Sequence, residues 1–340
     1  RIYIKMLKLL IIIILSVNFV SASMVEKSFT YDDVKRSYLE FIPSNHNIKA
    51  PINLVIGLHG YSGSASGFEK ETTGMFNKSA EKYQFLAIYP QGEYFYNYAN
   101  KDYPFISSWN AFPNIKPNKE FCSLDAVIYP KYPNCKNPNR CSWTSCIDDL
   151  GFIKKIIDIS KENYLIDKVF VIGMSNGGMM AQALACKYPN LFSGVINVVG
   201  MQPLGASCIP EIPVNFIIYG GALDRVTPPI NIQSYDGYFY EPMDKTFNSW
   251  SNKFKCKFNE LNKIDAHNNI TKKVSYGCNG NIKIISLLNN DAGHTWPGIN
   301  NSERGYCHTG AQNNIISPDC KIEVNNVWGN DLLLDILFNL

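Results

Sequence analysis

A serine lies between two glycines, each two positions away from it, at residues 173–177 of the chain. An apolar run at 168–172 precedes this motif, and residues 178–187 after it have the pattern of a helix. A serine on a tight turn between a strand and a helix exposes its hydroxyl, and its neighbours must be small to avoid collision. The helix N-terminus adds a positive field where negative charge develops. The same letters also occur in glycine-rich turns, but this context predicts that Ser175 is a nucleophile in covalent catalysis.

A serine hydroxyl is a poor nucleophile until a base takes its proton. His294 lies in a loop at 291–298 that follows a predicted strand at 283–288. The chain order serine, acid, histidine places the base in such a late loop, so we expect His294 to be the general base. The chain has five histidines in all, and the others are expected in loops or at the end of an early strand: His46, His59, His267 and His308.

The acid of such a triad must lie between the serine and the histidine in the chain, where it fixes the tautomer of the imidazole. Asp224 meets this requirement because it follows an apolar strand predicted at 214–219. We therefore expect Asp224 to be the acid. The rival carboxylates, none of which follows a buried strand, are Asp236, Glu241 and Asp244.

Acyl transfer also needs backbone N–H groups aimed at the oxyanion that forms on the carbonyl. One is expected from Asn176, directly after the nucleophile, and the other from Tyr61, in the loop at 58–64 that follows an early strand. His59 lies in the same loop, and we expect it to support the loop by hydrogen bonding rather than to act as the base.

Strands alternate with helices over most of the chain, which predicts a mostly parallel sheet with helices on both faces. The strands are expected at 37–42, 53–58, 85–89, 169–173, 194–199, 214–219 and 283–288. The helices are expected at 68–83, 148–164, 178–187 and 332–340. Two segments, 94–146 and 298–326, lack periodicity and contain several cysteines. Long irregular segments of this kind are usually functional or held by disulfides.

The composition limits the classes of protein to which the chain can belong. It has 340 residues, of which 46% are hydrophobic, so it can bury a sizeable core. Its net charge is only +3 and no basic block stands out, which argues against nucleic acid as a partner. No linker separates two cores, so residues 23–340 are expected to form one catalytic domain. The cysteine spacing does not fit a zinc ribbon, and we expect no metal site.

Residues 1–22 have the pattern of a secretory signal peptide, with positive residues, an apolar run and a small-residue site, and Met6 is the expected start. The rival interpretation, a membrane anchor, requires a longer apolar run. Ten cysteines, an even number, agree with an oxidising compartment, so we expect a secreted, extracellular protein without a stable membrane anchor. In a eukaryotic host, the glycan acceptors would be Asn77, Asn269 and Asn300.

Together these motifs resemble a family of secreted esterases, similar to poly(3-hydroxybutyrate) depolymerases and to family 1 carbohydrate esterases, including feruloyl esterases. The segments that carry the resemblance are 58–61, 89–92, 109–111, 148–152, 173–180, 184–186 and 293–298. The resemblance implies an α/β-hydrolase fold. It also implies a serine carboxylic ester hydrolase that works through an acyl-enzyme and needs no metal or organic cofactor. The cysteine-rich insert at 94–146 departs from the family pattern by its length, so the resemblance says little about it.

The implied partner is an ester substrate, which can be polymeric, and feruloyl-type esters of plant cell walls are the favoured class. The expected substrate-binding residues are His59, Trp109 and Trp296. The alternative, at least equally favoured for the aromatic residues, is that they pack the insert. An aliphatic polyester such as polyhydroxybutyrate is the alternative, and a peptidase or a non-catalytic binding protein on the same fold is less favoured. In the family, the segment that carries the acid usually reads His-Gly-x-x-Asp. Here Tyr219 and Gly220 precede Asp224 with one residue too many, so either Gly221 takes the place of the family glycine or the loop carries an insertion.

The resemblance also bears on the cysteines. Cys256 and Cys278 look like a bridged pair of related enzymes, and Cys186 with Cys208 is a further expected pair. Cys307 and Cys320 are expected to close the late loop. The insert cysteines leave three connectivities open and are Cys122, Cys135, Cys141 and Cys146.

Overall fold

The computed structural model describes residues 23–44, 46–47, 49–72, 76–97, 105–112, 121–135, 141–264, 269–298 and 328–340. The expected signal peptide at 1–22, the expected Cys307–Cys320 pair and Asn300 lie outside these residues. Within the described ranges, no helix is long and apolar enough to cross a membrane.

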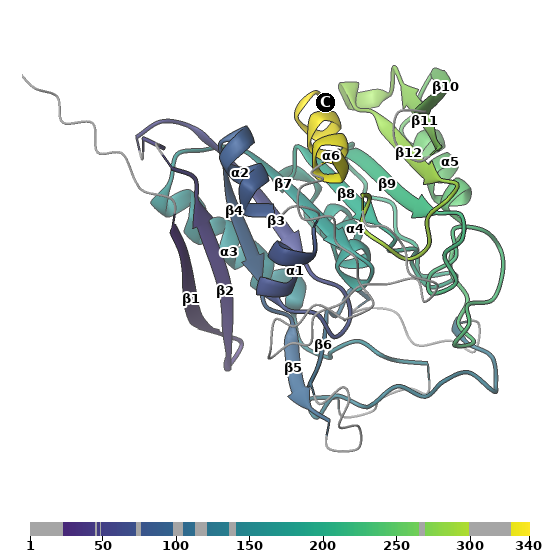
Figure 1. Ribbon diagram of the computed structural model, residues 1–340, viewed down its shortest axis with the longest axis horizontal. Coiled ribbons are helices and arrows are strands. Elements are labelled where there is room, and N and C mark those ends of the chain that lie inside the picture. The colour runs from purple at the N-terminus through teal and green to yellow at the C-terminus, as the bar shows by residue number, and fades with distance from the viewer. Residues whose placement is uncertain are drawn as a thin grey trace, which may run out of the picture.

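A 10-stranded sheet runs through the molecule in the order β1-β2-β4-β3-β7-β8-β9-β12-β11-β10 (Figure 1). The strands from β4 to β12 in this order pair in parallel, whereas both edges are antiparallel. The strands are β1 (Ser23–Tyr31), β2 (Val34–Ile42), β3 (Ile52–Leu58), β4 (Phe85–Pro90), β7 (Ile166–Met174), β8 (Gly194–Val198), β9 (Asn215–Gly221), β10 (Phe258–Ile264), β11 (Ile270–Tyr276) and β12 (Ile284–Asn289). The predicted parallel sheet is therefore confirmed.

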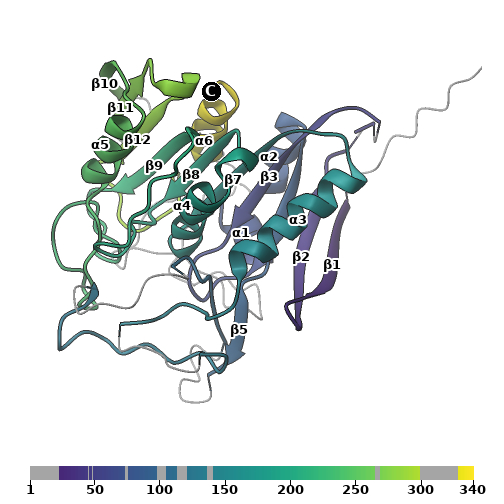
Figure 2. The same ribbon diagram turned by 180° about the vertical axis from the view of Figure 1, so that it is seen from behind.

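Alternate residues of the parallel strands pack on opposite faces of the sheet, as the two-residue period of a strand requires. In β3, Leu54 and Ile56 belong to the apolar cluster on one face, whereas Val55 belongs to the cluster on the other. The first face is covered by α3 (Asp149–Asn163), α4 (Asn176–Lys187) and α5 (Met243–Lys253), and the second by α1 (Ala65–Glu71), α2 (Phe76–Tyr83) and α6 (Trp328–Phe338). Figure 1 shows the second set in front of the sheet. Figure 2, which views the molecule from the opposite side, shows the first set in front of the sheet. The predicted α/β-hydrolase fold is confirmed.

The single helix predicted at 68–83 is wrong, because α1 ends at Glu71 and α2 begins at Phe76. The chain leaves the helix at Thr72, whose backbone is extended and whose hydroxyl donates to the carbonyl oxygen of Phe68. Threonine and glycine at 72–74 are poor helix formers, and a hydroxyl that bonds the backbone competes with helical geometry. Short 3₁₀ helices are also present at η2 (Pro189–Leu191) and η3 (Asn279–Asn281).

The cysteine-rich insert begins with an antiparallel hairpin of β5 (Glu93–Tyr96) and β6 (Phe105–Ser108). Two interlaced disulfides then hold its later part, Cys122–Cys141 and Cys135–Cys146, which selects one of the three open connectivities. The other two expected pairs within the described ranges are both present, Cys186–Cys208 and Cys256–Cys278.

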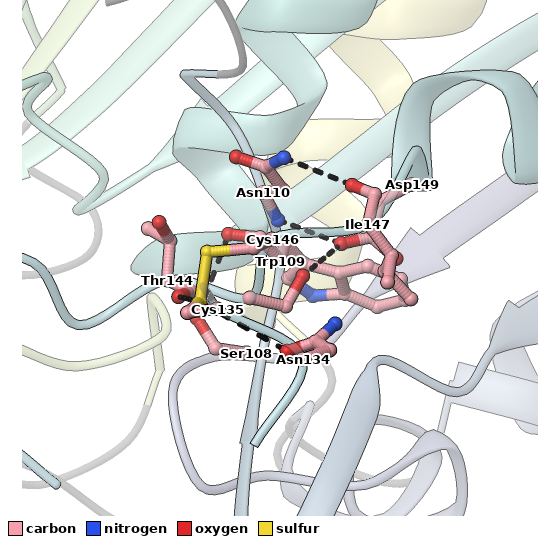
Figure 3. The surroundings of a disulfide bond; sticks show 10 residues. Ser108, Trp109, Asn110, Asn134, Cys135, Thr144, Cys146, Ile147 and Asp149 are labelled. Carbon is pink, nitrogen blue, oxygen red and sulfur yellow. Dashed lines mark hydrogen bonds between the residues drawn. A yellow bond between two sulfur atoms is a disulfide. The ribbon is translucent and has the colours of Figure 1, made fainter. Parts of the chain in front are cut away.

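The second insert disulfide lies beside the start of α3 (Figure 3). There the side chain of Asn110 donates to the carbonyl oxygen of Ile147, and its backbone N–H donates to Asp149 at 2.7 Å. The insert is therefore joined to the start of α3 by hydrogen bonds as well as by the chain itself.

Candidate active site

Ser175 lies on the turn between β7 and α4, where its backbone has φ 56° and ψ −121°. A residue other than glycine rarely adopts a positive φ, and here it projects the serine from the carboxyl end of the strand. A Cβ on Gly173 would lie 2.1 Å from the carbonyl oxygen of Gly177, and a Cβ on Gly177 would lie 2.2 Å from that of Leu58. Both positions therefore require glycine, for the steric reason that the sequence suggested.

The structure brings together the residues predicted as base and acid. Nδ1 of His294 lies 2.8 Å from Oδ2 of Asp224, and both side chains are buried. The other carboxylate oxygen of Asp224 accepts the backbone N–H groups of Val226 at 2.7 Å and Thr227 at 3.0 Å. Because Nδ1–H of the neutral imidazole donates to the carboxylate, Nε2 is the nitrogen left to accept a proton from a nucleophile.

Gly221 lies where the acid loop and the base loop meet. It is the last residue of β9, and its carbonyl oxygen accepts the N–H of Asp224 at 3.0 Å. A Cβ at this position would lie 2.2 Å from the carbonyl oxygen of Gly293, so no side chain fits. This close approach favours the alternative in which Gly221 takes the place of the family glycine.

The rival carboxylates bind other groups. Hydrogen bonds or ion pairs connect Asp236 to Tyr129 and Ser234, Glu241 to Lys245, and Asp244 to Lys273. None of these contacts reaches the imidazole of His294, so the geometry favours Asp224 as its partner.

The loop after β3 passes directly beside the nucleophile. A Cβ on Gly60 would lie 3.3 Å from Cβ and 3.9 Å from Oγ of Ser175, so the missing side chain leaves space next to the hydroxyl. Asn176 begins α4, and the first N–H groups of a helix have no partner within the helix. Within the described part of the chain, neither the N–H of Asn176 nor that of Tyr61 meets a hydrogen-bond acceptor. Both N–H groups are thus available to a ligand, as the predicted oxyanion hole requires.

The side chain of Asn176 joins the nucleophile turn to the insert. Its Oδ1 accepts the N–H of Trp109 at 2.7 Å and the hydroxyl of Ser108 at 3.0 Å. The indole N–H of Trp109 in turn donates to the carbonyl oxygen of His59 at 2.8 Å. Sequence reasoning predicted only the backbone of Asn176 and missed Ser108, for which no local signal exists.

His59 uses both of its ring nitrogens within the protein. Nδ1 lies 2.8 Å from the carbonyl oxygen of Gly60, and Nε2 accepts the backbone N–H of Gly92 at 2.9 Å. Burial lowers the pKa of His59 to about 4, so the ring is neutral at physiological pH. A ring with both nitrogens occupied supports the loop, as expected, and is not available as a second base. Its burial also does not favour the expected contact with substrate.

Trp109 and Trp296, the other expected substrate-binding residues, are both 0% exposed. The indole N–H of Trp296 donates to Oδ1 of Asn330 in α6 at 2.8 Å, and its ring packs edge-on against Phe68. These contacts favour a role in which the tryptophans position the loops of the site rather than touch the substrate.

The disulfide-held insert packs against two other segments. One is the loop at 58–64 that carries Tyr61 (the oxyanion loop), and the other is the segment at 224–240 that begins with Asp224 (the acid segment). The ring of Tyr129 lies 5.4 Å from that of Tyr61, and Trp143 approaches Tyr61 from another side at 6.1 Å. The hydroxyl of Tyr129 donates to Asp236 at 2.6 Å, and the N–H of Val127 donates to the carbonyl oxygen of Asp236 at 2.9 Å. The insert therefore contacts both the loop of Tyr61 and the segment that follows Asp224.

Among the residues that the structure describes, no group of three or more His, Cys, Asp and Glu side chains could hold a metal ion.

No family model matches the chain. It is 32% identical over 83 residues to poly(3-hydroxyalkanoate) depolymerase C of Paucimonas lemoignei, which covers 22% of this chain and 20% of that protein. It is 25% identical over 191 residues to acetylxylan esterase A of Talaromyces purpureogenus, which covers 56% of this chain and 40% of that protein. The chain thus matches less than half the length of these relatives, and its similarity to esterases of the α/β-hydrolase type is distant.

Two solved structures align with most of this chain. Acetyl xylan esterase from Aspergillus awamori is 15% identical, with 80% of this chain and 95% of that chain covered and a TM-score of 0.47. A ferulic acid esterase from Anaeromyces mucronatus is 12% identical, with 83% and 87% covered and a TM-score of 0.45.

Proposed function

We propose that the chain is a serine carboxylic ester hydrolase that works through an acyl-enzyme. The observation that carries this proposal is the buried hydrogen bond between His294 and Asp224, on loops that leave the same edge of the sheet as the strained turn of Ser175. Serine, imidazole and carboxylate are the groups that this chemistry needs. The distant similarity to a depolymerase and an acetylxylan esterase supports an ester as the bond that is cleaved.

In the proposed reaction, Oγ of Ser175 attacks the ester carbonyl while Nε2 of His294 takes the hydroxyl proton. The N–H groups of Tyr61 and Asn176 stabilise the oxyanion, and Asp224 stabilises the imidazolium. His294 then gives the proton to the leaving alcohol, which departs and leaves the acyl group on the serine. Water attacks this acyl-enzyme with the same base, which releases the carboxylic acid and restores Ser175.

A fluorophosphonate probe tests the nucleophile, because such probes react with an activated serine. We expect wild-type protein to be labelled, Ser175→Ala to be unlabelled, and His294→Ala to react at least about 10³-fold more slowly. Ser193→Ala, at the amino end of β8, is the matched control and should be labelled at the wild-type rate. Absence of labelling in a folded wild-type chain would contradict the proposal.

Feruloyl-type esters of plant cell walls are the proposed substrate of a secreted enzyme. Aromatic rings beside the oxyanion loop support a phenolic acyl group, since Tyr94 and Tyr96 in β5 are 52% and 42% exposed. The hairpin that carries them is held to that loop by the N–H of Ser62, which donates to the carbonyl oxygen of Ser107 at 2.8 Å. The four disulfides support an oxidising compartment.

An aliphatic polyester is the second candidate, and a different observation favours it. Large apolar side chains are exposed on the insert and on the acid segment, which hydrogen-bond to each other. They are Leu124 (92%), Val127 (51%), Ile128 (63%), Leu223 (61%) and Ile230 (51%). Several exposed apolar side chains close to a candidate site are typical of a surface that contacts apolar partners.

Hydrolysis rates on methyl ferulate, a hydroxybutyrate oligomer and acetylated xylan separate the candidates. Preferred turnover of methyl ferulate supports the first candidate, preferred turnover of the oligomer supports the second, and preferred turnover of acetylated xylan contradicts both. For the second candidate, Ile128→Asp should slow hydrolysis of a polyester film roughly thirtyfold, since burying such a side chain is worth about 2 kcal/mol. Leu261→Asp in the edge strand β10, where the leucine is 68% exposed, is the control that should not change the rate.

A further inference from the structure

The turn that follows β8 packs against the nucleophile. Val199 has φ 43°, in the left-handed region that a β-branched residue very rarely adopts. The carbonyl oxygen of Val198 accepts the N–H of Ser175 at 2.8 Å, and a Cβ on Gly200 would lie 2.5 Å from the carbonyl oxygen of Ser175. A strained backbone of this kind persists only where its surroundings enforce it, and such strain clusters at functional sites.

Thr227 contacts both this turn and the acid–base pair. Its hydroxyl oxygen lies 2.7 Å from the carbonyl oxygen of Val199, 3.2 Å from Oδ2 of Asp224 and 3.3 Å from Nδ1 of His294. A hydroxyl has one hydrogen to donate and lone pairs with which to accept. The shortest contact takes the hydrogen, so the carbonyl of Val199 is the acceptor. A lone pair of the oxygen then faces the Nδ1–H of the imidazole.

We propose that Thr227 is a positioning residue that couples the nucleophile turn to the acid–base pair, an inference that rests on the proposed triad. The Nδ1–H of His294 has a principal acceptor in Asp224 and a second in Thr227, which together fix the tautomer and the plane of the ring. The same hydroxyl anchors Val199, next to the carbonyl that binds the N–H of Ser175. The side chain of Thr227 thereby fixes the position of the nucleophile relative to the base. This side chain is buried, so water does not compete for its hydrogen bonds.

The test compares two substitutions at this position. Thr227→Val keeps the branched shape and removes the hydroxyl, whereas Thr227→Ser keeps the hydroxyl. On a soluble p-nitrophenyl ester, we expect Thr227→Val to lower kcat about tenfold with KM changed by less than about twofold, because misplaced groups affect the transition state more than binding. We expect Thr227→Ser to restore kcat to within about twofold of wild type. The rate of fluorophosphonate labelling should follow kcat.

Thr72→Val is the matched control. Thr72 is also buried, and its hydroxyl donates to a backbone carbonyl at 3.0 Å, but at the end of α1 rather than beside the triad. This variant is expected to lose stability in thermal unfolding without losing kcat. The proposal is overturned if Thr227→Val has wild-type kcat, if Thr227→Ser is as slow as Thr227→Val, or if Thr72→Val slows the reaction equally. A folded wild-type chain without labelling would instead overturn the proposed function.

Discussion

The nucleophile turn and the insert lie side by side but are held in place by different forces. Around Ser175 the chain is fixed by contact between backbone atoms, so closely that Gly173 and Gly177 admit no Cβ. The insert is fixed by the disulfides Cys122–Cys141 and Cys135–Cys146 and by hydrogen bonds to the segment that follows Asp224. One region depends on the exact fit of neighbouring atoms, and the other depends on crosslinks.

This difference predicts how each region fails. A close-packed turn cannot absorb an added methyl group, so changes there should damage folding and chemistry together. A crosslinked loop tolerates changes of its exposed side chains, because its path does not depend on them. Changes in the insert should therefore affect the choice of substrate before they affect the reaction of Ser175.

The largest effect is expected where the insert joins the main fold, at the buried ion pair of Arg36 in β2 and Asp149 in α3. Their nearest atoms are 2.6 Å apart, and the second oxygen of Asp149 accepts the hydroxyl of Ser145 at the end of the insert. Arg36→Leu leaves a buried carboxylate without its cation, which should cost about 4 kcal/mol in urea unfolding. Lys154→Leu removes an exposed ion pair and should leave the free energy of unfolding nearly unchanged. Equal losses in the two variants would show that burial does not matter here.

The next effect tests the close-packed turn. Gly177→Ala places a methyl group 2.2 Å from the carbonyl oxygen of Leu58, where the neighbours are backbone atoms that cannot rotate away. We expect a loss of about 3 kcal/mol together with loss of fluorophosphonate labelling. Gly60→Ala is the milder comparison, because its nearest contact is Cβ of Ser175 at 3.3 Å, and it should fold while labelling slows. Wild-type behaviour of Gly177→Ala would refute the packing argument.

His59 makes the stability of the same region depend on pH. Its pKa is lowered by burial to about 4 in the folded chain, whereas the unfolded chain binds a proton near pH 6.5. The unfolded state therefore gains the proton first, and stability falls as pH drops from about 6.5 toward 4. Between pH 7 and pH 4.5, protonation of this single group in the unfolded chain should lower the free energy of unfolding by about 2.5 kcal/mol. The change in stability between these two pH values should be smaller by that amount in His59→Gln, measured by urea unfolding, and an unchanged difference would exclude His59 as the cause.

The sequence predicted the elements of the nucleophile turn well, because the reasons for them are local. Gly173 and Gly177 surround Ser175 in the chain itself, and the apolar strand before them is buried on both faces. Asp224 and His294 could be placed because each follows a strand of the parallel sheet. The strands β1, β10 and β11 were missed, since strands at or next to an edge of the sheet are partly exposed and lack a continuous apolar run.

The remaining features depend on contacts between distant segments, which a single sequence does not reveal. Thr227 follows Asp224 closely in the chain, but its partners are Val199 and His294. Trp109 and Trp296 are of a residue type that is common in binding surfaces. In the structure, however, their indole N–H groups donate within the protein and both rings are buried. An aromatic residue can pack or bind, and only the tertiary structure decides which.

The smallest effect on stability is expected in the insert, where it should separate substrate selection from chemistry. Replacing Cys135 and Cys146 by serine opens a disulfide with a sequence separation of 11, which should cost about 2 kcal/mol, the low end of the usual range. The Cys135–Cys146 bond lies beside the start of α3, whereas Ser175 is held by its own close-packed turn. The fluorophosphonate should therefore still label Ser175 at nearly the wild-type rate. Turnover of a polymeric ester should fall, because the insert loosens.

Removal of the Cys256–Cys278 bond is the matched control, since this disulfide joins α5 to the edge of the sheet away from the insert. It should lower stability to a similar degree and leave the ratio of polymer turnover to labelling unchanged. If both double variants changed that ratio equally, general loosening of the fold would explain the effect. If the insert variant alone lost labelling, the two regions would share one mode of support, and the contrast between close packing and crosslinks would not hold.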